Sequence, residues 1–190
     1  MQAVSYTDES LMLRYRDGDY AAFETLYHRH SRGLYRFISW QAPRSDWADE
    51  IAQDAWMRLH HARETYQPQA SFKTLLYQIA RNRLIDMLRQ QRPVLASELN
   101  GDDDGDTFSH LADRAGHEEA PEAGIASRQR SEALHRAISQ LPAEQKEALV
   151  LHQFSEMTLA EIAQLTGAKE ETVKGRLRYA MQKLKVMLAA

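Results

Sequence analysis

The sequence predicts an all-α protein with two small helical domains joined by an acidic flexible linker. Apolar residues recur every three or four positions in both halves of the chain, which is the spacing of one helix face. No segment alternates apolar and polar residues, so no sheet is expected. Residues 93–126 combine acidic residues with Pro and Gly and contain few large apolar side chains. Such a composition cannot bury enough surface to offset the entropy of ordering, which indicates a linker.

The first domain, residues 1–92, is predicted to contain four helices. Their expected N-terminal caps are Thr7 or Asp8, Asp19, Ser45 or Asp46, and Ser71. Gly18 ends the first helix, Pro68 falls in a loop, and Pro93 is expected to close the domain. The residues expected to face inward on the last three helices are Ala22, Phe23, Leu26, Tyr27, Leu34, Phe37 and Ile38; Ala48, Ile51, Ala52, Ala55 and Leu59; and Phe72, Leu75, Leu76, Ile79, Ala80, Leu84 and Leu88.

The second domain, residues 127–190, is also predicted to be helical. Pro142 suits the first turn of a helix that runs to about Phe154, and Thr158 caps a short helix that follows. A tight turn at Thr166–Ala168 leads into a last helix from about Lys169. The residues expected to face inward are Leu134, Ala137, Ile138, Leu141, Leu159, Ile162, Ala163, Val173, Leu177, Ala180, Leu184 and Leu188.

The charge of the chain is unevenly distributed. The net charge is −3, but residues 93–127 alone carry −8, whereas the segments before and after carry +2 and +3. Because local patches matter more for phosphate binding than the total, the two flanks remain candidates for nucleic-acid binding. We hypothesise that the acidic linker keeps the free domains off DNA or lies in a basic nucleic-acid channel of a partner.

The segment from Thr158 to Leu184 follows the pattern of a helix-turn-helix, in which the second helix enters the major groove. The face of that helix opposite its apolar stripe carries Lys169, Lys174, Arg176, Arg178 and Lys183. Lys and Arg at such positions can contact guanine edges or phosphates. From periodicity alone, a helical hairpin with a solvated basic face remains an equal alternative.

Three short segments of the sequence favour a DNA-binding helix-turn-helix over a solvated helical hairpin. Leu141-Pro142, the run Leu159–Ala163 and the run Thr172–Leu177 resemble the second conserved domain of the extracytoplasmic-function (ECF) family of sigma-70-type RNA polymerase sigma factors. The stretches DGDYAAFETLYHRHSRGLYRFI, ADEIAQDAWMRLH and SFKTLLYQIARNRLIDMLRQ resemble the family's first domain. The resemblance covers residues 8–92 and 128–186, in the family's order and with a variable linker between.

The resemblance implies that the second domain reads the minus-thirty-five promoter element. Base-reading positions of the family fall on Lys174, Gly175 and Arg178, and positions that touch the DNA backbone fall on Thr172 and Arg176. Lys169 and Glu171 complete the expected surface. Glu171 stands where many members have Gly, and Gly175 replaces a family serine and has no side chain to donate a hydrogen bond.

The resemblance assigns two functions to the first domain. One is docking on core RNA polymerase through residues that lie off the predicted apolar face: Glu50, Gln53, Asp54 and Trp56. An exposed Trp56 would suit a protein interface. The alternative is that the Trp56 side chain is half packed within the domain. The other is recognition of the melted minus-ten element by the loop 66–71 and the helix after it. The candidates there are Phe72, Lys73, Tyr77, Arg81, Asn82 and Arg83. Core packing is an equal alternative for Phe72, and Leu75 stands where many members carry tryptophan.

The remaining expectations follow from what the sequence does not contain. There is no cysteine, no phosphate-cradling glycine loop and no metal-binding or catalytic spacing among the eight histidines, so we expect no metal, no cofactor and no enzymatic activity. The chain shows no apolar run long enough to cross a membrane and no leader, which indicates a cytoplasmic protein. An anti-sigma factor is an expected further partner, by resemblance. A helix-turn-helix regulator that binds its operator unaided and an adaptor that only sequesters a partner remain as alternatives.

Overall fold

The computed structural model describes residues 6–98 and 124–189. All regular structure in these two ranges is helical, which confirms the predicted all-α class. The helices form two compact units, one on each side of residues 99–123. The order of units agrees with the two predicted domains.

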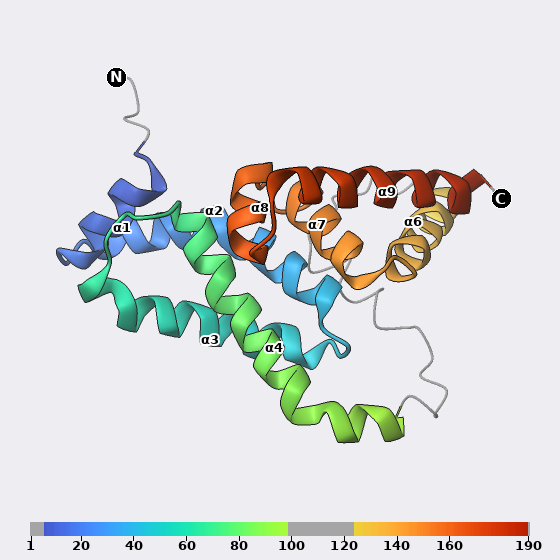
Figure 1. Ribbon diagram of the computed structural model, residues 1–190. Helices are drawn as coiled ribbons and strands as arrows, with labels where there is room; N and C mark the ends of the chain where they lie inside the picture. The colour runs from blue at the N-terminus through green and yellow to red at the C-terminus, as the bar shows by residue number, and fades with distance from the viewer. Residues whose placement is uncertain (1–5, 99–123, 190) are drawn as a thin grey trace. The chain divides into compact units, whose positions relative to one another are not determined.

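The first unit packs four α-helices around one apolar core. They are α1 (Asp8–Arg16), α2 (Tyr20–Gln41), α3 (Asp46–Ala62) and α4 (Phe72–Glu98), with a short 3₁₀ turn, η1 (Arg63–Thr65), after α3. Helix α1 folds back along α2, and α4 packs against both α3 and α2 (Figure 1). The largest fully buried side chains of this core are Met12, Leu26, Leu34, Phe37, Ile38, Ile51, Leu59, Phe72, Leu76 and Tyr77.

Three of the four predicted caps in this unit form a side-chain hydrogen bond. Thr7 Oγ1 accepts from Ser10 N at 3.2 Å, and Asp19 Oδ1 accepts from Ala21 N at 3.1 Å. Ser71 Oγ accepts from Thr74 N at 3.1 Å at the start of α4. Ser45 occupies the predicted cap position of α3, but its side chain makes no cap hydrogen bond. Its backbone has helical angles, which differ from the extended conformation of Thr7 and Asp19.

Pro93, expected to close the first domain, does not end helix α4. Helix α4 continues through Pro93 to Glu98, and Figure 1 shows it bending toward this end. A proline inside a helix removes one N–H donor and displaces the preceding turn, so a bent helix is the ordinary way to accommodate it. The predicted linker therefore overlaps helical backbone at 93–98 and again at 124–126. The flexibility predicted for its central part concerns residues that lie outside the described ranges.

Within residues 124–189, the second unit has three helices that pack against a fourth and last one. They are α6 (Gly124–Ser139), α7 (Ala143–Gln153), α8 (Leu159–Thr166) and α9 (Glu170–Ala189). Helix α9 contacts α6, α7 and α8 (Figure 1). It buries Val173, Ala180 and Leu184, as predicted. Pro142 is the residue just before α7, whereas the prediction placed it in the first turn of that helix.

Three residues predicted to face inward are exposed. Tyr27 of the first unit is 44% exposed, and Leu134 and Leu188 of the second are 39% and 49% exposed. Each lies at the margin of an apolar stripe or near a helix end. A period of 3.6 residues identifies the centre of a buried face more sharply than its edges.

Candidate nucleic-acid interface

Helices α8 and α9 form the predicted helix-turn-helix, and each part of it has a local cause. Thr158 Oγ1 accepts from Glu161 N at 3.2 Å, while Glu161 Oε2 accepts from Thr158 N at 2.9 Å. This reciprocal pair satisfies two N–H groups at the start of α8. Gly167 follows α8 with φ +67°, a left-handed conformation that glycine adopts at little cost. Ala168 N then donates to Ala163 O at 3.0 Å, which fixes the turn into α9.

The outer face at the start of α9 is polar and accessible. Lys169, Glu171, Thr172, Lys174 and Arg178 are all exposed, whereas Val173 on the opposite side is fully buried. Lys174 Nζ lies 3.9 Å from Glu171 Oε1, a surface pair of little energetic weight. The Arg178 guanidinium lies over the Tyr179 ring, 5.2 Å from its centre. The exposed predicted residues therefore lie within the first part of α9 and at the residue just before it, with Glu171, Lys174 and Arg178 on one side of the helix.

Arg176 differs from the other predicted DNA contacts because it is already paired. Its guanidinium donates to Glu144 Oε2 at 2.7 Å, and its side chain is only 20% exposed. Glu144 belongs to the first turn of α7, so the pair connects α7 to α9. A phosphate contact by Arg176 requires that this pair be shared or opened. The sequence analysis did not identify Glu144, which lies 32 positions away in the chain.

Helix α3 presents three of its four predicted docking residues outward. The Glu50 side chain is 55% exposed and that of Asp54 31%, and Gln53 is exposed. The expected outward position of Trp56 is wrong, since Trp56 is only 8% exposed. Its ring packs against Phe23 at 5.8 Å and Tyr27 at 5.1 Å between ring centres. Helix α2 supplies aromatic neighbours that the spacing within α3 does not reveal.

The predicted minus-ten residues divide into a buried and an accessible group. Phe72 and Tyr77 are 0% and 1% exposed. Their rings lie 5.3 Å from His30 and 5.4 Å from Phe37, so they are core residues with no exposed face for stacking on a base. Core packing, the alternative for Phe72, is the reading that the burial supports. Lys73 and Arg81 are half-buried and Asn82 is exposed, with its Oδ1 accepting from Gln78 Nε2 at 2.9 Å.

Arg83, the last of the predicted minus-ten residues, contacts a side chain of this protein. It reaches from α4 to α3 and donates to Glu50 Oε1 at 2.8 Å. A residue predicted to meet DNA is thus bound to a residue predicted to meet polymerase.

Comparisons with known proteins agree with this division into two units. The model of Sigma-70 region 2 matches residues 26–94, and that of Sigma-70 region 4 matches residues 131–184. The ECF RNA polymerase sigma factor SigM of Mycobacterium tuberculosis is 29% identical over 182 residues, which cover 96% of this chain and 85% of SigM. The ECF RNA polymerase sigma factor RpoE of Cereibacter sphaeroides is 30% identical over 179 residues, covering 93% of this chain and 92% of RpoE.

This chain is an ECF sigma factor. As a member of this sigma-70-type family it is an alternative sigma factor, a protein that binds core RNA polymerase and directs promoter-specific initiation of transcription. A solved structure of the sigma factor RpoE in complex with the anti-sigma factor NepR from Bartonella quintana has the same fold, with a TM-score of 0.69 at 18% identity. That match covers 88% of this chain and 97% of the other.

The sigma factor also contains contacts around the loop 66–71 that the sequence did not reveal. Glu9 Oε1 accepts from Phe72 N at 2.9 Å and so caps α4 from a distance of 63 positions. Tyr66, at the start of the loop, is 6% exposed, and burial, together with the charges of Glu9 and Asp8, raises its pKa to about 12. His30 is buried beside Asp8. No local pattern indicates these contacts, because their partners are far apart in sequence.

Two further features concern the described residues of this sigma factor. None of the helices within residues 6–98 and 124–189 has the length and apolar content needed to cross a membrane. In the same ranges, no three His, Asp or Glu side chains lie together in a way that could hold a metal ion.

Proposed function

We propose that the first half of α9 enters the major groove of the minus-thirty-five element and reads it through Lys174 and Arg178. The observation that carries this proposal is the division of α9 into a buried stripe and an exposed polar face directly after the glycine turn. Lys169, just before α9, and Thr172, in its first turn, are also exposed and are suited to phosphate contacts. Glu171 can accept from a cytosine amine, and Gly175 brings the helix backbone close to the groove.

The test compares Lys174→Ala and Arg178→Ala with Lys185→Ala, an exposed lysine near the other end of α9. Holoenzyme affinity for promoter duplex is measured for each variant. Each lost base contact is expected to weaken binding by about 1–3 kcal/mol and to relax selectivity at one base pair. Lys185→Ala is expected to leave both unchanged. Equal behaviour of all three variants would reject α9 as the reading helix and favour the adaptor alternative.

We propose further that Glu50, Gln53 and Asp54 form the surface that docks on core polymerase. This proposal is supported by the exposure of the three side chains on one side of α3, opposite the buried residues Ala48 and Ile51. Trp56 supports the aromatic packing behind this surface instead of making the contact itself. The double variant Glu50→Gln/Asp54→Asn is expected to weaken core binding at low salt, where charged partners attract most strongly. Asp86→Asn, an exposed carboxylate on α4, is the matched control.

For the melted minus-ten strand we propose Lys73, Arg81 and Asn82 together with the loop 66–71. The two cationic groups are suited to the backbone of a single strand, and the Asn82 amide to a base edge. Asn82→Ala in saturating holoenzyme is expected to slow promoter opening, followed by a fluorescent base in the minus-ten element. Unchanged opening would remove Asn82 from the site.

We also propose the wider setting of the protein. It functions in the cytoplasm as a non-enzymatic partner of polymerase. Its three parts are a first domain of residues 1–92, a linker of residues 93–126 and a second domain of residues 127–190. An anti-sigma factor binds it and holds it inactive; in support, the similar sigma factor RpoE has been solved in complex with the anti-sigma factor NepR. The acidic residues Asp102–Asp106 act in initiation; neutralising them is expected to change the ratio of abortive to full-length transcripts, and an unchanged ratio would reject this role.

A further inference from the structure

Arg83 bridges two carboxylates of the neighbouring helix. Its guanidinium donates to Glu50 Oε1 at 2.8 Å, and its Nε lies 3.4 Å from Asp54 Oδ2. The second contact is an ion pair without hydrogen-bond geometry. Glu50 and Asp54 are one helical turn apart on α3, where two like charges repel. Arg83 from α4 offsets that repulsion together with Arg58 of α3, whose Nε donates to Asp54 Oδ2 at 2.7 Å.

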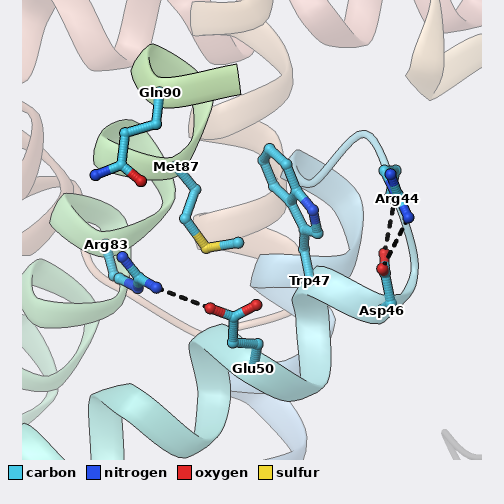
Figure 2. A pocket seen from close by; sticks show the side chains of 7 residues that line it. All are labelled: Arg44, Asp46, Trp47, Glu50, Arg83, Met87 and Gln90. Atoms are coloured by element: carbon cyan, nitrogen blue, oxygen red, sulfur yellow. Dashed lines mark hydrogen bonds and ion pairs between the residues drawn. The ribbon is translucent and has the colours of Figure 1, made fainter. Parts of the chain in front are cut away.

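The exposure of the three side chains shows which charge faces solvent. The Arg83 side chain is 23% exposed, compared with 31% for Asp54 and 55% for Glu50. The Arg83 side chain is therefore more covered than the two acidic side chains that it contacts. Figure 2 shows Arg83 reaching from α4 toward Glu50 at the edge of a polar pocket, with Trp47 and Met87 along its wall. Arg44 is paired with Asp46 at the other side of the pocket, at 3.0 Å.

We propose that Arg83 is a positioning residue for polymerase docking, which holds the Glu50 and Asp54 carboxylates from behind so that they meet cationic groups of the polymerase. This inference rests on the proposed docking function of α3. It moves Arg83 from the predicted DNA surface to the polymerase surface. The carboxylates are then already ordered before docking, so less side-chain entropy is lost when the polymerase binds.

The expected size of the effect follows from that cost. Ordering one or two flexible side chains at an interface corresponds to about a 3- to 10-fold change in affinity. Arg83→Gln is expected to weaken core binding by this factor, and Arg83→Lys, which keeps the charge but loses the planar fork, to restore part of it. The matched control is Arg89→Gln, an exposed arginine on the same helix, which is expected to bind core normally.

The experiment measures affinity of full-length variants for core polymerase by fluorescence titration, beside their thermal unfolding midpoints. Arg83→Gln is also combined with Glu50→Gln/Asp54→Asn. If Arg83 acts through these carboxylates, it changes affinity no further in that background. A purely structural role predicts instead an added loss that follows the unfolding midpoint, and this result would overturn the proposal. Tighter binding by Arg83→Gln would also overturn it, because Arg83 would then compete with polymerase for the carboxylates.

The same variants separate this inference from the docking proposal and from a DNA role. If Glu50→Gln/Asp54→Asn binds core normally, the docking function itself fails. If that double variant loses affinity and Arg83→Gln does not, only the role of Arg83 fails. If Arg83→Gln binds core normally but slows promoter opening at saturating polymerase, Arg83 is a DNA contact, and the inference is wrong.

Discussion

Asp8 is the residue that fixes the start of α1 to the rest of the first unit. Its Oδ2 lies 2.7 Å from His30 Nε2, and its Oδ1 accepts from Arg29 Nη1 at 2.9 Å. The hydrogen bond with His30, aided by Arg29 and opposed by partial burial, lowers the pKa of the Asp8 carboxyl below its ordinary value of 3.8. The ionised form is therefore stabilised in the folded protein.

This pKa shift predicts how stability depends on pH. Because the folded pKa lies below that of the unfolded chain, the stabilisation is complete above pH 3.8 and is lost as pH falls through the folded value. Asp8→Asn is expected to lower the free energy of unfolding at pH 7 by about 1–3 kcal/mol. The difference from the natural protein should shrink in acid. Urea unfolding followed by tryptophan fluorescence measures it, with the exposed Asp17→Asn as control; a difference that is constant with pH would contradict the assignment.

Gly175 offers a second prediction about a single residue. A Cβ added there meets nothing within 4 Å, so a side chain fits without strain. Gly175→Ser, which introduces the serine found in many family members, is expected to strengthen promoter binding by about 2- to 10-fold through one added hydrogen bond. Gly175→Ala is the control, because it gains helix propensity without a hydroxyl. Equal gains from Ser and Ala would mean that helix stability, and not a DNA contact, limits binding.

Single residues also show where sequence reasoning ends. Thr7, Asp19 and Thr158 were predictable as caps, because a cap acts on backbone only two or three positions away. The burial of Trp56 and Tyr77 was not predictable, because it depends on side chains of α2. The sequence spacing places a residue on a face of its own helix but does not say what covers that face.

At the scale of elements, the helix-turn-helix depends on two local devices, the capping box of α8 and the left-handed glycine after it. Thr158→Ala removes the first and is expected to lower the stability of the second unit by about 0.5–2 kcal/mol. Urea unfolding followed through the NMR amide signals of α8 and α9 measures this change. The exposed Gln164→Ala on the same helix should cost far less, and equal losses would mean that the cap does not set the stability of α8.

The helices within residues 6–98 and 124–189 were predictable, but the end of α4 was not. Pro93 was expected to end α4, and the helix instead continues to Glu98 with a bend. A proline restricts its own backbone and the residue before it, yet an established helix can absorb one lost hydrogen bond. Contacts between elements, such as Arg176–Glu144 and Arg83–Glu50, were beyond reach, because they join residues more than thirty positions apart.

At the scale of the whole molecule, the two units divide the work of a sigma factor. The unit formed by α1–α4 carries the proposed docking and melting surfaces, and the unit formed by α6–α9 carries the proposed duplex reader. Each unit lies in a segment of mildly positive net charge, separated by a segment of −8. Weak phosphate attraction by each unit alone is consistent with a protein that selects DNA only when polymerase brings both units to one promoter.

Transcription in vitro from a fragmented genomic library, with and without core polymerase, tests this account most directly. The natural protein with core is expected to start transcripts at a limited set of promoters that share two spaced elements, and alone to bind the same duplexes weakly. Lys174→Ala/Arg178→Ala should lose selectivity for the upstream element only. Tight, specific duplex binding by the protein alone, with no start sites gained when core is added, would contradict the account and indicate a regulator that binds its operator unaided.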